Sequence, residues 1–418
     1  MPDVSFAGLV IVSAVAFVAP LALGLFPRVR VPAVVLEIVL GIVIGPSVLG
    51  WVHMDVSIGV LAVIGLGFLL FLAGLEVELD RLRGPLLRLP GLGFVASLAV
   101  AGAIAALIAV VGLIHAPLLV AIALVATSLG LVVPVLRDAG ESRTDFGQLV
   151  IAGATVADFG AVILLTLFFS GESSGVGTKL LLLGIFGGLV GAAGLSVATA
   201  GRSMRISAAL VRLQDTTAQI RVRGAVLLLI SFVALAARFG LETILGAFLA
   251  GVVLGLMDRD RMMTHPHFRL KLEGLGYGFF VPVFFISSGI RFDLQALFAS
   301  ASSLALIPLF LVALILARGV PALLYRPVIH TPRTAAAALL QATSLPFIVT
   351  ATSIGVALHQ ISKATAAALV AAGLMSVLVF PTVALSLLQR AGASQTRRTM
   401  AEPIRTVPNE EKGRAHGR

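Results

Sequence analysis

The stretch APLLVAIALVATSLGLVVPVL at residues 116–136 is apolar enough to cross a membrane, but a Thr-Ser pair and a glycine interrupt its centre. The stretch TAAAALLQATSLPFIVTATSIGVA at 334–357 repeats the pattern, with proline in place of that glycine. A helix broken at mid-membrane exposes backbone polar groups, which survive only where protein or a wet cavity satisfies them. Matched interruptions in two halves of a chain point to a transporter's binding site. The interrupted positions are Thr127, Ser128 and Gly130, and Thr343, Ser344 and Pro346.

The composition excludes a water-soluble fold. Of the 418 residues, 59% are hydrophobic and 12% charged, whereas soluble domains are about 25% charged. The net charge of +10 would suggest a nucleic-acid partner, but the basic residues lie in short loops between apolar runs, so we expect none. The chain has no cysteine, which excludes disulfides and thiolate metal sites.

Apolar runs of about 20 residues predict an all-α membrane domain over residues 1–390. We predict thirteen spans, at 4–26, 32–50, 56–75, 89–111, 116–136, 146–170, 180–200, 222–238, 242–257, 274–290, 295–324, 334–357 and 364–389. Seven spans separate the two interrupted stretches, so they should run in opposite directions through the membrane. Closely spaced glycines from Gly184 to Gly194 suggest tight helix packing, within the protein or between protomers.

The basic residues predict the orientation. Of 30 Lys and Arg residues, 25 lie on one set of alternate loops and 4 on the other. Because cytoplasmic loops carry the excess of Lys and Arg, we expect the N-terminus outside and the C-terminus in the cytoplasm of a bacterial inner membrane. The basic segment 391–418 is predicted to be a disordered cytoplasmic tail that contacts anionic lipid.

One acidic residue is predicted to lie deep in the membrane. Asp158 is the thirteenth residue of the run FGQLVIAGATVADFGAVILLTLFFS at 146–170, and no other ionisable residue lies there. Burial disfavours its charged form, whereas a nearby cation favours it. A carboxylate balanced between these effects can exchange a proton for a monovalent cation. The predicted oxygen ligands are Asp158, Thr155 one turn earlier, Thr127 and Ser128. The alternative is a structural carboxylate that holds two helices together.

Two further charges lie within predicted spans. Arg318 is inside LALIPLFLVALILARGVPALLY and, because arginine keeps its proton in proteins, it supplies a fixed positive charge. It could pair with Asp158 or face the carbonyl ends of the broken helices, and the alternative is a side chain that extends to the cytoplasmic surface. For Glu37 we expect a structural or gating role. Glu76 reads as part of a solvated loop.

A family resemblance is carried by LEIVLGIVIGPSVLGW at 36–51, FLLFLAGLEVELDRLR at 68–83, ATSLG at 126–130, LGAFLAGVVLG at 245–255 and FFVPVFFISSGIRFDL at 279–294. Together these stretches resemble the monovalent cation:proton antiporter superfamily, in its Kef- and Nap-type sodium (or potassium)/proton exchanger branch. The resemblance covers nearly all of residues 1–390.

The resemblance implies an inverted-repeat fold in which a core of two crossed, broken helices moves against a dimerising scaffold, as an elevator. It places the ion- and proton-binding aspartate at Asp158 and the core's basic residue at Arg318. One position departs from the family pattern: Ala157 stands where members commonly have Asp, Asn or Gln. With one carboxylate, the site binds either one proton or one cation, so we expect electroneutral exchange of Na+ or K+ for H+.

Three other functions stay open at this point. A Kef-type potassium efflux system normally carries a nucleotide-binding domain, which the tail is too short to hold, so a separate regulatory subunit would have to supply it. A sodium-coupled symporter of an organic anion uses similar broken helices. A membrane sensor would need no transport at all. We expect no enzyme activity and no cofactor, because no nucleophile–base or metal constellation falls at membrane depth.

Overall fold

The computed structural model of the chain describes residues 6–26, 32–76, 88–169, 176–201, 216, 218–257 and 266–401. Within these ranges the regular elements are helices and there is no strand, which confirms the all-α prediction. The helices are α1 Phe6–Leu25, α2 Ala33–Ile44, α3 Val56–Leu75, α4 Arg88–Val110, α5 Pro117–Val125, α6 Leu129–Asp138, α7 Asp145–Phe169, α8 Val176–Gly201, α10 Ile220–Arg238, α11 Thr243–Met257, α12 Pro266–Leu275, η2 Gly276–Phe280, α13 Val281–Ile290, α14 Leu294–Phe298, α15 Ala301–Leu314, η3 Ile315–Gly319, η4 Pro321–Tyr325, α16 Arg326–Ala342, α17 Pro346–Ala357 and α18 Lys363–Ala401.

The apolar helices fall where the spans were predicted. In the described ranges, ten helical stretches are long and apolar enough to cross a membrane, and three shorter apolar ones cover Ala33–Ile44, Pro117–Val133 and Thr243–Leu256. The protein is therefore a multi-pass membrane protein, while the exact number of thirteen crossings stays a prediction. Helix α18 continues to Ala401, beyond the boundary predicted at 390, and residues 402–418 lie outside the described ranges.

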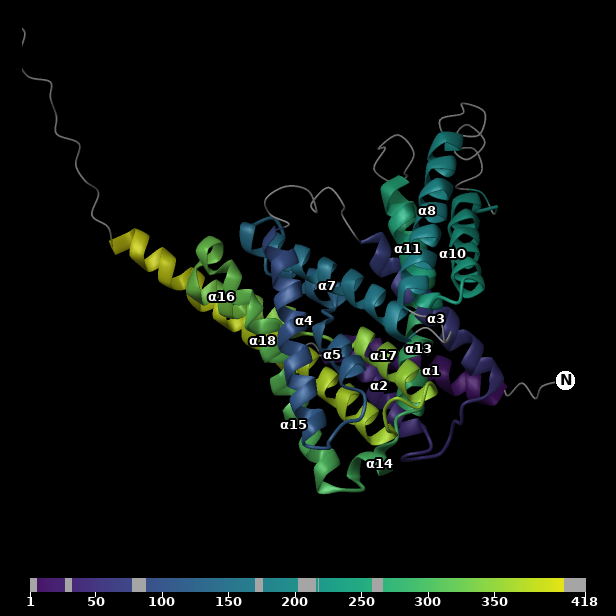
Figure 1. Cartoon of the computed structure of the whole chain (residues 1–418), viewed down its shortest axis with the longest axis horizontal. Coiled ribbons are helices and arrows are strands. Elements are labelled where there is room, and N and C mark those ends of the chain that lie inside the picture. Colours follow the sequence, from purple (N-terminus) through teal and green to yellow (C-terminus); the bar gives the residue numbers. More distant parts are fainter. Residues whose placement is uncertain are drawn as a thin grey trace, which may run out of the picture.

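The helices form two bundles (Figure 1). The scaffold bundle comprises α1–α3, α8 and α10–α13 with η2, and the broken-helix bundle comprises α4–α7 and α15–α18 with η3 and η4. Packing is extensive within each bundle. Between them it is sparse and runs chiefly through α7 against α8 and α11, and through α18 against α2. The short helix α14 lies on the connection from one bundle to the other and packs on α15 and α18.

Glycines bring the scaffold helices into backbone contact. A Cβ added to Gly41 of α2 would strike the Ile286 carbonyl of α13, and one added to Gly74 of α3 would strike the Phe248 carbonyl of α11. Because the interior is close-packed, a larger residue at these positions would force the helices apart. The glycines of α8 behave differently. A Cβ on Gly184, Gly187, Gly188 or Gly191 meets nothing within 4 Å, and only Gly194 approaches a neighbour, Val253.

The two predicted interruptions are confirmed. Helix α5 ends at Val125 and α6 begins at Leu129, while α16 ends at Ala342 and α17 begins at Pro346. The two unwound segments meet: the Ser128 N–H donates to the Thr343 carbonyl at 2.9 Å. Each break therefore satisfies a backbone group of the other, as a membrane interior requires.

Two π-helical turns lie next to prolines. The turn η2 ends two residues before Pro282, and η3 ends two residues before Pro321. A proline lacks the N–H of a regular helix and clashes with the carbonyl four residues earlier, which in both cases lies inside the π turn. Such turns are frequent at functional sites, and these two carry Tyr277 and Arg318.

Candidate functional site

Asp158 on α7 faces the first helix break. Its Oδ2 accepts the Leu129 N–H at 3.1 Å. Leu129 is the first residue of α6, so its N–H has no partner within its own helix. The positive end of the α6 dipole therefore favours a negative charge on Asp158, while the surrounding apolar helices oppose it.

The Asp158 cavity, of about 120 Å³, lies between the two bundles and is lined by residues from both. The breaks contribute Ser128, Leu129, Gly130, Pro346 and Phe347 to it, and the scaffold bundle contributes chiefly Val34, Leu69, Leu70, Ala73, Phe248, Tyr277 and Phe285. A cavity of this volume has room for about four waters at liquid density. Asp158 therefore presents a titratable side chain to a cavity that is large enough for a small ion.

Arg318 is buried on η3, with 1% of its surface exposed, and it binds three separate elements. Its guanidinium donates to Thr127 Oγ1 in the break at 2.9 Å, to Ser97 Oγ of α4 at 3.0 Å and to the Gly153 carbonyl of α7 at 3.2 Å. The alternative of a side chain reaching the cytoplasmic surface is thus wrong. Among the described residues Arg318 forms no ion pair with a carboxylate, so hydrogen bonds to neutral groups hold it in place.

The hydroxyl of Thr127 connects the charge to the second broken helix. It accepts from Arg318 and donates to the Gln341 carbonyl of α16 at 2.7 Å. Thr155 has a different position: its hydroxyl donates to the Ile151 carbonyl of its own helix at 2.9 Å, and it does not line the Asp158 cavity. Of the four predicted ligands, Asp158 and Ser128 line the cavity, Thr127 ties the breaks together, and Thr155 bonds within α7.

The second break is held mainly by hydroxyls. The hydroxyl of Thr343 donates to the Leu339 carbonyl at 3.0 Å, and the Ser344 N–H donates to Ser376 Oγ of α18 at 3.2 Å. Ser344 Oγ is buried without a hydrogen-bond partner. These positions hold the break, and only Pro346 and Phe347 of this segment reach the Asp158 cavity.

Glu37 on α2 is 5% exposed, and within the described ranges it has neither a hydrogen bond nor an ion pair. It lies one turn after Val34, which lines the Asp158 cavity. The structure therefore places Glu37 close to the site without joining it to the network of Arg318, and its predicted structural or gating role stays a prediction.

Several site residues carried no signal in the sequence. Ser97 and Gly153 are small residues in apolar runs, yet both bind Arg318. The chain has two tyrosines, and both lie here: Tyr277 lines the Asp158 cavity, and the Tyr325 hydroxyl accepts from Gln341 Nε2 at 3.0 Å. Because tyrosine is so rare in this chain, its two positions were the one signal in the sequence that could have marked Tyr277 and Tyr325 as site residues.

We expect Gly153→Ala to destabilise the protein. The added methyl group would strike Gln341 Nε2 and lie 2.7 Å from the Tyr325 hydroxyl, so the neighbours of Arg318 would have to shift. Overpacking of this kind typically costs about 1–3 kcal/mol, which should appear as a lower thermal unfolding temperature in detergent. The control is Gly102→Ala on α4, where the methyl group meets nothing within 4 Å. Equal melting temperatures for both variants would contradict the packing described here.

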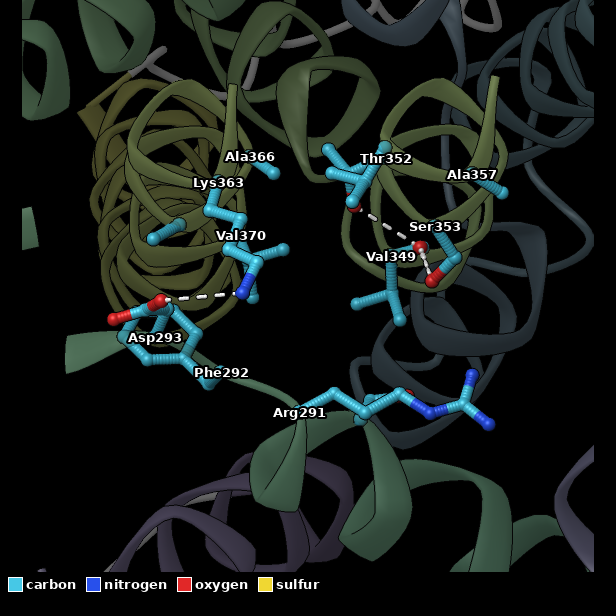
Figure 2. A pocket seen from close by; sticks show the side chains of 13 residues that line it. Arg291, Phe292, Asp293, Val349, Thr352, Ser353, Ala357, Lys363, Ala366 and Val370 are labelled. Atoms are coloured by element: carbon cyan, nitrogen blue, oxygen red, sulfur yellow. Dashed lines mark hydrogen bonds and ion pairs between the residues drawn. The ribbon is translucent and has the colours of Figure 1, made fainter. Parts of the chain in front are cut away.

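A second cavity, of about 380 Å³, lies further along α13 and α17 (Figure 2). One turn of α13 separates Phe285, which lines the Asp158 cavity, from Ser288, which lines this one, and α17 also lines both. Asp293 and Lys363 form an ion pair of 3.8 Å at its edge, and Arg291 extends along the opposite side (Figure 2). Burial lowers the pKa of Arg291 from its usual range. The two cavities thus lie in series along the seam between the bundles.

Comparison with known proteins gives consistent matches. A sequence profile of the family described as "Sodium/hydrogen exchanger, transmembrane" matches residues 13–390. YjbQ of Bacillus subtilis, provisionally named a Na+/H+ antiporter, is 30% identical over 96% of this chain and 66% of its own length. GerN of Bacillus cereus, named a Na+/H+-K+ antiporter, is 30% identical over 65% of this chain and 69% of its own length. This chain therefore spans about two thirds of the length of both relatives.

A solved structure shares the fold. The sodium proton antiporter MjNhaP1 from Methanocaldococcus jannaschii, determined at pH 8, superposes with a TM-score of 0.63 at 18% sequence identity. The superposition covers 91% of this chain and 97% of that one. At this identity the likeness shows the antiporter fold and says nothing of which ion is moved.

Proposed function

The chain belongs to the sodium/hydrogen exchanger family, and from that membership we propose that it exchanges Na+ or K+ for H+ across a bacterial inner membrane. The observation that carries the proposal is Asp158, which faces a cavity lined by both broken helices and by the scaffold bundle. A proton and a hard cation compete for the same carboxylate oxygens. Whichever ion is bound therefore excludes the other, as antiport requires.

We propose that the exchange is electroneutral. The residue before Asp158 is Ala157, which is fully buried, and Asp158 is the one carboxylate among the described residues that line the cavity. Arg318 keeps its positive charge throughout. The site then carries the same net charge with one proton bound as with one monovalent cation bound, so a complete exchange cycle moves no net charge across the membrane.

We propose that alternating access occurs by movement of the broken-helix bundle against the scaffold bundle. The extensive packing within each bundle and the sparse packing between them support a rigid-body movement. The Asp158 cavity lies on the seam, and so does the larger cavity beside Arg291. A shift along this seam would connect Asp158 to one side of the membrane at a time.

The remaining features of the proposal rest on the sequence. With the N-terminus outside, the basic loops and the C-terminal segment face the cytoplasm. The scaffold bundle would supply the contact between two copies in a homodimer. This arrangement is compatible with a separate regulatory subunit. The name of GerN, a Na+/H+-K+ antiporter, supports both Na+ and K+ as candidate ions.

The test is cation-induced proton movement in liposomes that contain the purified protein and a trapped pH dye. Addition of Na+ or K+ should discharge an imposed pH gradient, and the exchange should produce no net current at any clamped membrane voltage. A net current coupled to exchange would contradict electroneutral exchange. No proton movement with Na+, K+ or Li+ would overturn the proposed function.

A further inference from the structure

Tyr277 is the polar scaffold residue in the Asp158 cavity whose hydroxyl lies beside the break. It is on η2, and its hydroxyl lies 3.9 Å from the position that a Cβ on Gly130 would take. Gly130 follows Leu129, whose N–H binds Asp158. The phenolic oxygen therefore sits beside the helical turn that holds Asp158, but it belongs to the opposite bundle.

The π turn fixes this tyrosine against the scaffold. A Cβ on the preceding Gly276 would lie 2.6 Å from a methyl group of Leu72, so the backbone here is pressed against α3. Phe280 at the end of the same turn stacks on Phe68 of α3, with ring centroids 5.0 Å apart. The backbone on either side of Tyr277 is thus packed against the scaffold, while 44% of the surface of Tyr277 itself is exposed.

Tyr277 also lies toward the charged end of the scaffold. Arg269 on α12 pairs with Glu76 at the end of α3 at 3.9 Å and with Glu273 at 2.8 Å, and α12 continues directly into the π turn that carries Tyr277. The basic loops predict that this end faces the cytoplasm. Tyr277 therefore lies between the cytoplasmic end and Asp158.

We propose that Tyr277 is a specificity-determining residue, whose hydroxyl supplies an oxygen ligand from the scaffold to the cation held at Asp158. The inference rests on the proposed exchange function. Hard cations require several oxygen ligands, and the residues that line the cavity include Asp158, Ser128 and Tyr277, whose hydroxyl lies beside Gly130. A proton needs only the carboxylate. The tyrosine thus contributes to binding of the cation and not of the proton.

The test separates the effect of Tyr277 on cation binding from its effect on proton binding. Tyr277→Phe removes one oxygen and keeps the ring, so the apparent KM for the cation should rise severalfold. The maximal rate, and the pH of half-maximal exchange at saturating cation, should stay at the wild-type values. The control is Phe279→Leu on the same π turn, a 41% exposed residue that does not line the cavity. This variant should keep the wild-type KM.

Two results would overturn the inference. One is an unchanged KM in Tyr277→Phe, and the other is an equal shift of the cation and proton parameters, which would indicate a structural role. Binding distinguishes failure of the inference from failure of the exchange function. If wild type moves no protons, stabilisation of the purified protein by Na+ or K+ at constant ionic strength still reports the site. That stabilisation should be weaker in Tyr277→Phe, and equal stabilisation would overturn the ligand role.

Discussion

Asp158→Asn is expected to reduce cation-driven proton movement to the level of protein-free liposomes. The amide keeps the size of the side chain and can still accept the Leu129 N–H, so the fold should survive. It has no titratable proton and no negative charge to hold a cation. Both halves of the exchange are therefore lost together, and the variant should melt close to wild type or above it, because a buried charge has been removed.

The matched control is Asp145→Asn on the same helix. Asp145 lies in the first turn of α7, remote from the Asp158 cavity, where a carboxylate contributes about 0.3–1 kcal/mol through the helix dipole. Its removal should leave the transport rate within about twofold of wild type and lower stability slightly. Exchange that persists in Asp158→Asn would place the ion site elsewhere in the protein.

Arg318→Ala is expected to have the largest effect on stability. The substitution leaves Thr127, Ser97 and the Gly153 carbonyl without their buried donor. Each such loss costs about 1–3 kcal/mol, so the free energy of unfolding should fall by about 3 kcal/mol or more. Thermal unfolding in detergent measures the loss, and exchange in liposomes should disappear with it, because the first break, α4 and α7 lose their common partner.

Arg318→Lys tests whether geometry or charge matters. A lysine ammonium is a compact point charge and cannot reproduce the planar fork of a guanidinium, which here spans acceptors on three elements. We expect an intermediate melting temperature and strongly reduced exchange. Arg238→Lys, at the exposed end of α10, is the control and should behave as wild type. A fully active Arg318→Lys variant would show that the site needs only a positive charge.

The sequence predicted those features that depend on strong local signals. The glycine and the proline at the two ATSL segments identified the breaks, and one acid in an apolar run identified Asp158. The position of Arg318 was uncertain, because an arginine near a helix end can extend to water or remain buried. Its three acceptors are brought together only by packing, from positions 97, 127 and 153. No spacing within one helix could have grouped them.

Glu76 shows a different limit of sequence reasoning. The acids and arginines from Glu76 to Arg83 read as a solvated loop, yet the Glu76 side chain is 19% exposed and its Oε2 has no hydrogen-bond partner. Burial raises the pKa of Glu76 above its usual range, although Arg269 at 3.9 Å opposes the shift. Arg269, which approaches this acid, lies on α12 in a distant part of the chain. Glu78, Arg81 and Arg83 lie outside the described residues.

The hydrogen bond between the two breaks also determines when the first break can fold during synthesis. Ser128 leaves the ribosome 215 residues before Thr343, the residue whose carbonyl its N–H will bind. At a synthesis rate of roughly 5–20 residues per second, Thr343 is made about 10–40 s after Ser128. The Thr127 hydroxyl waits as long for the Gln341 carbonyl, and almost as long for Arg318. During that interval the unwound segment cannot face lipid without cost. The first half of this protein should therefore remain in contact with the insertion machinery, or with water, until the second half arrives.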